Sequence, residues 1–142
     1  MLENRFDIII EAHVEKVWNI LTALNKYAEW NPLLYKANGI ISAGESIIVH
    51  AKTATKDMRL KCNVEKVETF RELTWSFYII HPVLLQGVHT FQLEPDEDRV
   101  KFIDRERFSG VLLPTQVKDL KTNGLLAMIA MGEALKTRAE SE

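Results

Sequence analysis

Two carboxylates near the end of the chain have a spacing that suits acid–base chemistry. Asp104 and Glu106 lie two residues apart in a segment that alternates between polar and apolar residues, so a strand would place both on one face. That face also carries three apolar residues: Val100, Phe102 and Phe108. If the face looks into the interior, desolvation raises the pKa of a carboxyl group there, and such a group serves as a general acid or base.

His89 has the same placement on the preceding predicted strand, where it shares a face with Phe91 and Leu93. Facing strands would gather the imidazole and the carboxylates into one hydrogen-bonded cluster. Three interpretations are open here. The cluster is catalytic, with His89, Asp104 and Glu106 as candidates, or His89 and Glu106 satisfy each other or the rim of a pocket. In the third, a twist or bulge turns these groups towards water.

The remaining polar residues give little support for other reactive centres. Cys62 is the one cysteine, and it alternates with Leu60 and Val64, which predicts an inert core residue. The four histidines are scattered and lack the clustered partners of a zinc site. No glycine-rich phosphate loop occurs in the sequence. We therefore expect no metal and no cofactor, and the direction in which His50 faces stays undecided.

The spacing of apolar residues predicts the elements that position these groups. Residues 6–10 predict a strand, and residues 14–21 carry apolar side chains at helical spacing. A second short helix is predicted over residues 25–30 and ends before Pro32. Between residues 34 and 108 the period is two, interrupted by turn residues, which predicts about six strands. Their tight turns leave no crossover connections, so the sheet should be antiparallel.

One long helix is predicted from Pro114 to Ala139. Its apolar stripe recurs every three or four residues and should lie on the concave face of the sheet: Val117, Leu120, Gly124, Met128, Met131 and Leu135. About 26 residues at about 1.5 Å each span roughly 39 Å, enough to cross a strongly curved sheet. The glycine in the stripe thins the helix and leaves room for a ligand.

Aromatic and thioether side chains are predicted to line a cavity between this helix and the sheet. The sheet would supply Trp75, Phe77, Phe91 and Phe102, and the helix would supply Met128 and Met131. The predicted ligand-binding set is completed by four further residues: His89, Glu106, Phe108 and Gly124. A lining of this kind favours an apolar or aromatic small molecule.

Length and composition exclude several classes of protein. The 142 residues suit a single domain, 1–142, and the 46% hydrophobic and 27% charged content excludes disordered and fibrous chains. Eighteen Lys and Arg against 20 Asp and Glu give a net charge of −2, which argues against nucleic acid or anionic lipid as a partner. No apolar run reaches the roughly 18–20 residues of a membrane span, and no apolar leader follows Met1. We expect a cytoplasmic protein without membrane insertion, and the oligomeric state stays open.

The order of elements is similar to that of the START-like or SRPBCC superfamily, and four motifs resemble its polyketide cyclase/dehydrase-like branch. They are Val17-Trp18 with Trp30-Asn31-Pro32, then Glu72-Leu73-Thr74-Trp75, then Gly87-Val88-His89-Thr90-Phe91-Gln92-Leu93, then Glu106-Arg107-Phe108-Ser109-Gly110. The resemblance covers essentially the whole chain. It implies an α+β helix-grip fold, in which a curved antiparallel sheet of about seven strands wraps around a long C-terminal helix and two short helices follow the first strand. It also implies an apolar cavity between helix and sheet.

Three functions are compatible with this resemblance, because the fold does not fix the chemistry. The first is a binding module for a hydrophobic or aromatic molecule, lipid- or polyketide-like, whose polar group is oriented by His89 and Glu106. The second is a polyketide cyclase, aromatase or dehydratase-type enzyme that uses these residues as acid and base. The third is a protein-interaction domain resembling activators of chaperone ATPases, which a large exposed apolar patch on the sheet would favour.

Overall fold

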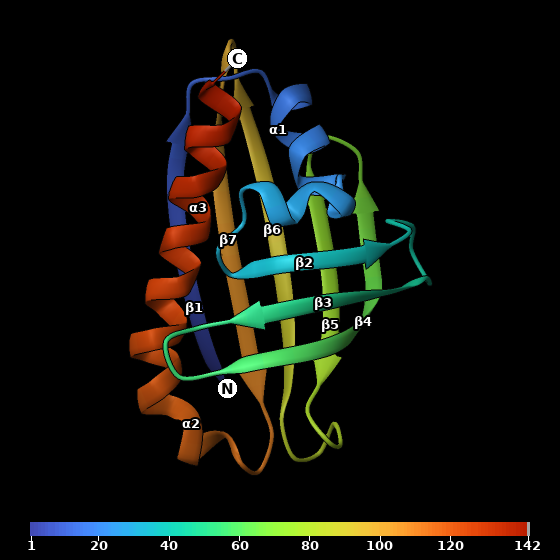
Figure 1. Cartoon of the computed structure of the whole chain (residues 1–142), viewed down its shortest axis with the longest axis vertical. Coiled ribbons are helices and arrows are strands. Elements are labelled where there is room, and N and C mark those ends of the chain that lie inside the picture. The colour runs from blue at the N-terminus through green and yellow to red at the C-terminus, as the bar shows by residue number, and fades with distance from the viewer. Residues whose placement is uncertain (142) are drawn as a thin grey trace.

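The computed structural model describes residues 1–141 as a curved sheet of seven antiparallel strands wrapped around a long C-terminal helix (Figure 1). The spatial order of the strands is β1-β7-β6-β5-β4-β3-β2. Their bounds are β1 Leu2–Ile10, β2 Leu34–Gly39, β3 Ser46–Lys52, β4 Asp57–Glu68, β5 Glu72–Tyr78, β6 Gln86–Asp96 and β7 Arg99–Ser109. The predicted antiparallel α+β helix-grip fold is confirmed.

The sheet curves because its strands are irregular at defined places. The pairing register between β4 and β5 shifts between Val64 and Lys66, and the β2–β3 register shifts between Leu34 and Lys36. An extra residue in one strand of a pair bends that strand and increases its twist. In Figure 1 the first half of β4 runs across the molecule with β2 and β3, whereas β5, β6 and β7 run along it. The bend therefore brings the β2–β4 part over the concave face.

Two short helices connect β1 to β2, as predicted. The α-helix α1 covers Val14–Thr22, and the 3₁₀ helix η1 covers Leu24–Glu29. Asn31 then directs the chain into β2, because its side-chain oxygen accepts hydrogen bonds from the backbone N–H groups of Leu33 (3.0 Å) and Leu34 (2.8 Å). Such a side-chain turn is the usual role of asparagine at the start of an extended segment.

The C-terminal helix is continuous but contains a π-helical turn. It consists of α2 (Leu113–Asp119), the π turn η2 (Leu120–Gly124) and α3 (Leu125–Glu140). A π turn takes up more residues than an α turn, so the residues before it are rotated away from a period of 3.6. The predicted stripe is therefore wrong at its first position: Val117 is exposed, and Gln116 faces the interior instead.

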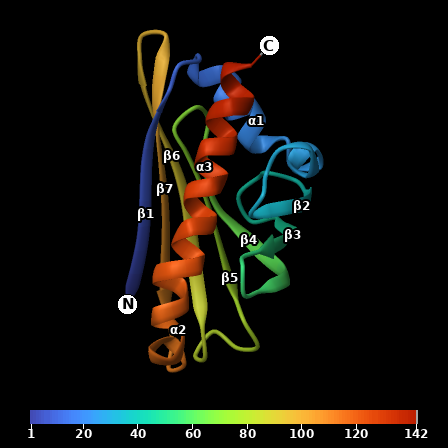
Figure 2. The same cartoon turned by 60° about the vertical axis from the view of Figure 1, so that its left-hand side comes forward.

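The helix lies closer to one edge of the sheet than to the other. Figure 2 shows α3 passing between β1 on one side and the β2–β3 hairpin on the other. Gly132 of α3 faces β1 so closely that an added Cβ would lie 2.5 Å from Cε2 of Phe6. Met128, Met131 and Leu135 are buried along the same helix. Within residues 1–141, no helix has the length and apolar character that a membrane span needs.

Two loops at one end of the sheet, β5–β6 and β7–α2, are joined by backbone hydrogen bonds. Val111 donates to the carbonyl of Val83, and Leu112 donates to that of Leu84, both at 2.9 Å. Gly110 permits this approach, because its φ is 128° and an added Cβ would lie 2.3 Å from the Leu84 carbonyl oxygen. This glycine is required both by its backbone conformation and by the space available.

We predict that Gly110→Ala destabilises the fold much more than Gly44→Ala. Both glycines have positive φ, but an added Cβ at Gly44 meets nothing within 4 Å, whereas at Gly110 it overlaps backbone. We expect a loss of about 1 kcal/mol for Gly44→Ala from backbone strain, and about 3 kcal/mol or more for Gly110→Ala. Urea denaturation measures both values. Equal losses would contradict the packing described for the two loops.

Candidate functional site

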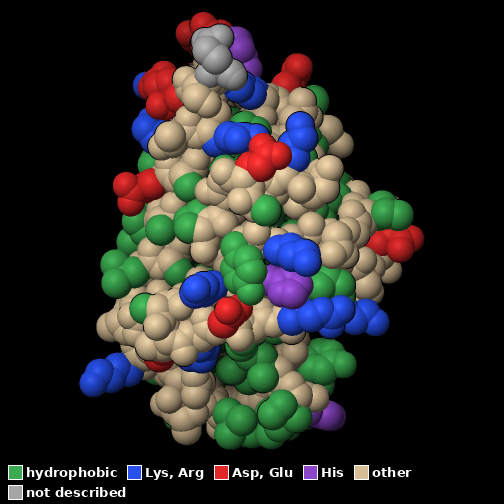
Figure 3. All heavy atoms as spheres, viewed as in Figure 1, with side chains coloured by type: hydrophobic (Ala, Val, Ile, Leu, Met, Phe, Trp, Pro, Cys, Tyr) green, Lys and Arg blue, Asp and Glu red, His purple; other side chains and the backbone are tan. Residues whose placement is uncertain are grey.

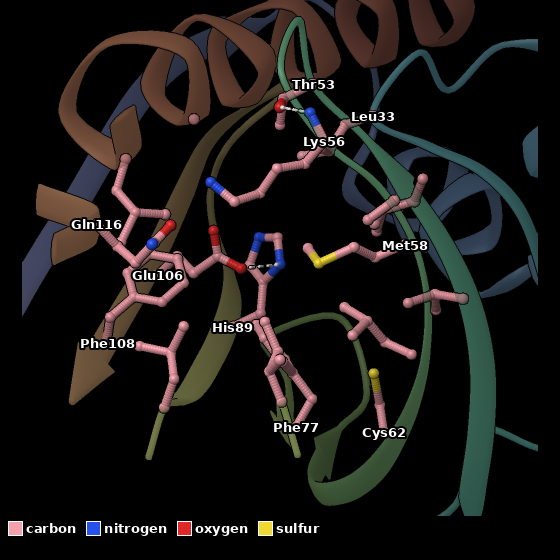
Figure 4. A pocket seen from close by; sticks show the side chains of 18 of the residues that line it. Leu33, Thr53, Lys56, Met58, Cys62, Phe77, His89, Glu106, Phe108 and Gln116 are labelled. Carbon is pink, nitrogen blue, oxygen red and sulfur yellow. Dashed lines mark hydrogen bonds and ion pairs between the residues drawn. The ribbon is translucent and has the colours of Figure 1, made fainter. Parts of the chain in front are cut away.

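A cavity of about 80 Å³ lies between the concave face of the sheet and the α2–η2 part of the helix (Figure 4). Its walls are mostly apolar. β3 and β4 contribute Val49, Met58, Leu60 and Cys62, and β5–β7 contribute Trp75, Phe77, His89, Glu106 and Phe108. The helix contributes Gln116, Asp119, Leu120 and Gly124. The volume is several times the roughly 10–15 Å³ that one water molecule needs.

Three ionisable groups form a chain at the floor of this cavity. The imidazole of His89 is hydrogen-bonded through Nε2 to Oδ1 of Asp104 at 2.6 Å. Its Nδ1 lies 3.5 Å from Oε2 of Glu106, which Figure 4 shows beside the ring. The side chains of His89 and Asp104 are 2% and 0% exposed, whereas that of Glu106 is 18% exposed. Of the two carboxylates, only Glu106 is among the residues that line the cavity.

The pairing of β6 with β7 creates this arrangement. His89 is directly opposite Glu106, and Phe91 is directly opposite Asp104. Residues directly opposite on antiparallel strands point to the same face, so all four side chains turn inward. The imidazole is held between aromatic rings, with its centre 4.3 Å from that of Phe91 and 5.9 Å from that of Trp75. The interpretation that turns these groups towards water is therefore excluded for His89 and Asp104.

Burial and charge act in opposite directions on His89. Burial alone lowers its pKa, but the charges of Asp104 and Glu106 and the hydrogen bond to Asp104 raise it more, to about 9. Burial also raises the pKa of Glu106, as does the charge of Asp104, while His89 lowers it in part. The floor of the cavity thus combines an imidazolium with a carboxyl group whose pKa is raised above its ordinary value.

The cavity is closed on the helix side by a second polar cluster, centred on Asp119. Its carboxylate pairs with the ammonium group of Lys56, and it accepts hydrogen bonds from Thr55 (2.7 Å) and Asn123 (2.9 Å). Hydrogen bonds from Lys56, then Asn123, then Thr55 lower the pKa of Asp119 to about 2. This Asp119 cluster ties the β3–β4 turn to the helix. The sequence analysis missed it, because nothing in the spacing of Lys56 and Asp119 links a turn to a helix 63 residues away.

The comparisons with known proteins place the chain in a family. A family model described as polyketide cyclase/dehydrase and lipid transport matches residues 1–140. The chain belongs to this family. A search of curated proteins finds no significant match.

Several solved structures share the fold of this polyketide cyclase/dehydrase family member. The Zhui aromatase/cyclase from Streptomyces sp. R1128 is similar, with a TM-score of 0.80 and 13% identity over 98% of this chain and 93% of that one. A hypothetical protein from Helicobacter pylori gives a TM-score of 0.82 and 16% identity over 98% and 88%. A START superfamily protein from Mycobacterium smegmatis gives 0.73 and 14% over 97% of each chain. Together with the family match over residues 1–140, this shared fold confirms the predicted superfamily.

The structure separates the predicted ligand-binding residues into two groups. Six line the cavity: Trp75, Phe77, His89, Glu106, Phe108 and Gly124. Four face inward but pack into the core away from it: Phe91, Phe102, Met128 and Met131. An added Cβ at Gly124 would lie 3.7 Å from Leu120 and 3.8 Å from Asn4, in ordinary van der Waals contact, so a methyl group fits there.

Cys62 and His50, two other polar residues considered from the sequence, are accounted for by packing. Cys62 is buried in the cavity wall, where burial and then the charge of Glu106 raise its pKa to about 12, so it remains a thiol. His50 lies on the strand face opposite Val49, with its ring centre 5.8 Å from that of Tyr35. Across the described residues 1–141, no group of three or more His, Cys, Asp or Glu side chains is arranged to hold a metal ion.

We predict that His89 titrates well above the ordinary value of about 6.5 for histidine. Its pKa is raised to about 9 in the folded chain, so the charged ring stabilises the fold below pH 6.5, and this contribution is lost as the pH rises through 9. NMR titration of the ring should give a midpoint near 9. In Asp104→Asn the midpoint should fall, because the nearest negative charge is gone. A wild-type midpoint at or below 6.5 would contradict the charged floor.

Proposed function

We propose that this protein binds an apolar, ring-containing small molecule that carries one hydroxyl or carbonyl group, and that Glu106 and His89 hold this group. The observation that supports it is the composition of the cavity, where one buried polar pair interrupts an otherwise apolar sheet wall. Pockets of this composition gain affinity from apolar contact and specificity from a few polar groups. The family description, which names cyclase/dehydrase and lipid transport, supports a role in ligand binding or polyketide processing.

The polar pair favours a ligand with a matching polar group over a plain hydrocarbon. A hydrocarbon would cover Glu106 without replacing the hydrogen bonds that this group makes with water, and an unsatisfied buried polar group costs about 1–3 kcal/mol. A hydroxyl can donate to the carboxylate, and a carbonyl can accept from the carboxylic acid. Burial raises the pKa of Glu106 above its ordinary value, which favours the acid form more than in an exposed carboxyl group.

The cavity volume sets the size of what fits without rearrangement. About 80 Å³ is small compared with the roughly 300–1,000 Å³ of typical ligand pockets and with the roughly 150 Å³ of a cavity that binds benzene. The closed form therefore suits only part of a ring-containing molecule. A larger ligand would require the β3–β4 turn to move away from the helix, which breaks the contacts of Asp119 with Lys56 and Thr55.

We predict that 2-naphthol binds more tightly than naphthalene, and that Glu106→Ala removes the difference. Losing the hydroxyl contact should weaken 2-naphthol binding about tenfold and leave naphthalene nearly unchanged. Quenching of the fluorescence of Trp75 in the cavity wall, together with isothermal titration calorimetry, measures both affinities.

Two variants to methionine test whether the ligands bind in the cavity, one at a residue of the cavity wall and one at a residue outside it. Cys62→Met fills the cavity and should abolish binding of both ligands, whereas Val88→Met on the outer face of β6 should leave binding unchanged. Equal affinities for 2-naphthol and naphthalene in the wild type would contradict recognition by Glu106. Undiminished binding in Cys62→Met would show that the ligand lies elsewhere.

A second function, acid–base catalysis on a polyketide-like substrate, is favoured by the state of Glu106 and His89. The Glu106 carboxylate can take the α-proton of a bound β-hydroxyketone, which forms an enolate beside the imidazolium of His89. The resulting carboxylic acid gives this proton to the β-hydroxyl group, the C–O bond breaks, water leaves, and the enone forms. Glu106 is regenerated, and the step needs no co-reactant. The positive charge of His89 favours the negative charge that develops on the substrate.

We predict that Glu106→Gln abolishes any such dehydration while keeping the shape of the cavity. With a bicyclic β-hydroxyketone as substrate, formation of the conjugated enone is followed by its ultraviolet absorbance. The rate should fall by about 10²- to 10⁴-fold in Glu106→Gln, which is the usual contribution of a general acid or base. Val88→Met should retain the rate. If wild type and Glu106→Gln are equally fast, or if neither exceeds the uncatalysed rate, the protein is a binder and not this enzyme.

A further inference from the structure

The β5–β6 and β7–α2 segments carry half of the large apolar side chains that the described residues expose. The β5–β6 segment exposes Tyr78, Ile80 and Val83, and the β7–α2 segment exposes Val111 and Leu112. Ile80 is 81% exposed and Val111 is 64% exposed. Figure 3 shows hydrophobic side chains gathered at the lower end of the molecule, where Figure 1 places these two loops. We call these five residues the apolar end.

The sequence around the apolar end is unusually poor in charge. No Asp, Glu, Lys or Arg occurs between Glu72 and Glu94, and none between Arg107 and Lys118. The first charged residues beyond the second loop on the helix are Lys118, Asp119 and Lys121. Both lysines are exposed, and Asp119 is paired with Lys56. Within residues 1–141 neither lysine forms an ion pair with an acidic side chain, although Lys121 donates to the backbone carbonyl of Glu3. An apolar surface with a basic border remains.

The apolar end is preformed. The two loops are joined by the hydrogen bonds from Val111 to Val83 and from Leu112 to Leu84. Ile80 has a φ of 67°, a conformation that is unfavourable for a β-branched residue. The structure therefore holds an isoleucine outward at the cost of backbone strain, which is typical of functional positions and gives no benefit to the core.

We propose that the apolar end docks this protein on an anionic lipid surface, with its loop side chains in the headgroup region and no helix crossing the bilayer. Charge complementarity favours this partner: a basic border attracts anionic headgroups, whereas two such borders repel each other in a dimer of copies. The loops project at the end of the molecule, so they suit a fluid interface better than a shaped protein groove. The net charge of −2 does not oppose it, because Asp119, the acidic residue between the two border lysines in the sequence, is paired with Lys56.

The apolar end adjoins the cavity, so docking would bring the cavity close to the lipid. Ile79 and Leu85, which flank the exposed loop residues, belong to the cavity wall, as does Phe108 at the end of β7. A docked molecule would therefore present one wall of its cavity to the lipid, where apolar molecules are dissolved. This exchange of ligand between membrane and cavity rests on the proposed binding function, whereas the docking itself does not.

The test is co-sedimentation with vesicles of equimolar phosphatidylcholine and phosphatidylglycerol, compared with vesicles of phosphatidylcholine alone. The wild type should bind the anionic vesicles more tightly and release them at high salt. Ile80→Asn should weaken binding about tenfold or more, because the docked protein would bury this isoleucine side chain among the lipids. Asparagine tolerates a positive φ, so this variant should fold at least as well as the wild type. Lys118→Gln and Lys121→Gln should each weaken binding about fivefold.

The matched control is Ile40→Asn, which changes an isoleucine that is 67% exposed outside the apolar end. It should bind vesicles as the wild type does. Absence of binding to anionic vesicles, or equal binding by Ile80→Asn and the wild type, overturns the proposal. So does a concentration-dependent dimer in sedimentation velocity that Ile80→Asn abolishes, because the apolar end would then contact a second copy. Affinity for 2-naphthol, measured separately, reports on the cavity and is expected to be unchanged in Ile80→Asn.

Discussion

The structure depends on one geometrical constraint: a single helix must cover the concave face of a seven-stranded sheet. The helix α3 meets this constraint at one edge only, where Gly132 allows close contact with Phe6 of β1. The opposite edge is brought over by the bend of β4 at its bulge. Close packing would otherwise fill an interior of this size. The cavity is the space that neither the α2–η2 part of the helix nor the bent strands can reach.

The same constraint explains why the polar residues of the cavity are so few. A buried charge is tolerated only when a partner and hydrogen bonds replace its hydration. His89 has a partner on each ring nitrogen, and Asp104 has His89. Oδ2 of Asp104 has no hydrogen-bond partner among the described residues, so the negative charge at the floor is stabilised mainly by the imidazolium. Removing the histidine would leave a buried carboxylate uncompensated.

The sequence predicted those features that depend on a local period, and it failed where a non-local contact decides. Alternation of period two correctly placed His89, Asp104 and Glu106 on the inward face. The alternation did not show which inward-facing residues reach the cavity. Phe91 and Phe102 share the inward face but pack into the core, with ring centres 5.9 Å apart. The helical period failed at η2, because a π turn leaves no mark in apolar spacing. The contacts of Asp119 with Lys56 could not be predicted, since they form only once the sheet has curled.

The difference between a binding protein and an enzyme in this fold then rests on one carboxyl group. Asp104 does not reach the cavity, and His89 is held by two carboxylates and aromatic rings, so neither is free to follow a reacting substrate. Of the two carboxyl groups, Glu106 alone lines the cavity, and burial raises its pKa. His89 positions it and keeps a positive charge beside it. A ligand whose oxygen meets Glu106 is bound, and a ligand that also presents an acidic α-carbon to it can be turned over, because both outcomes use the same proton.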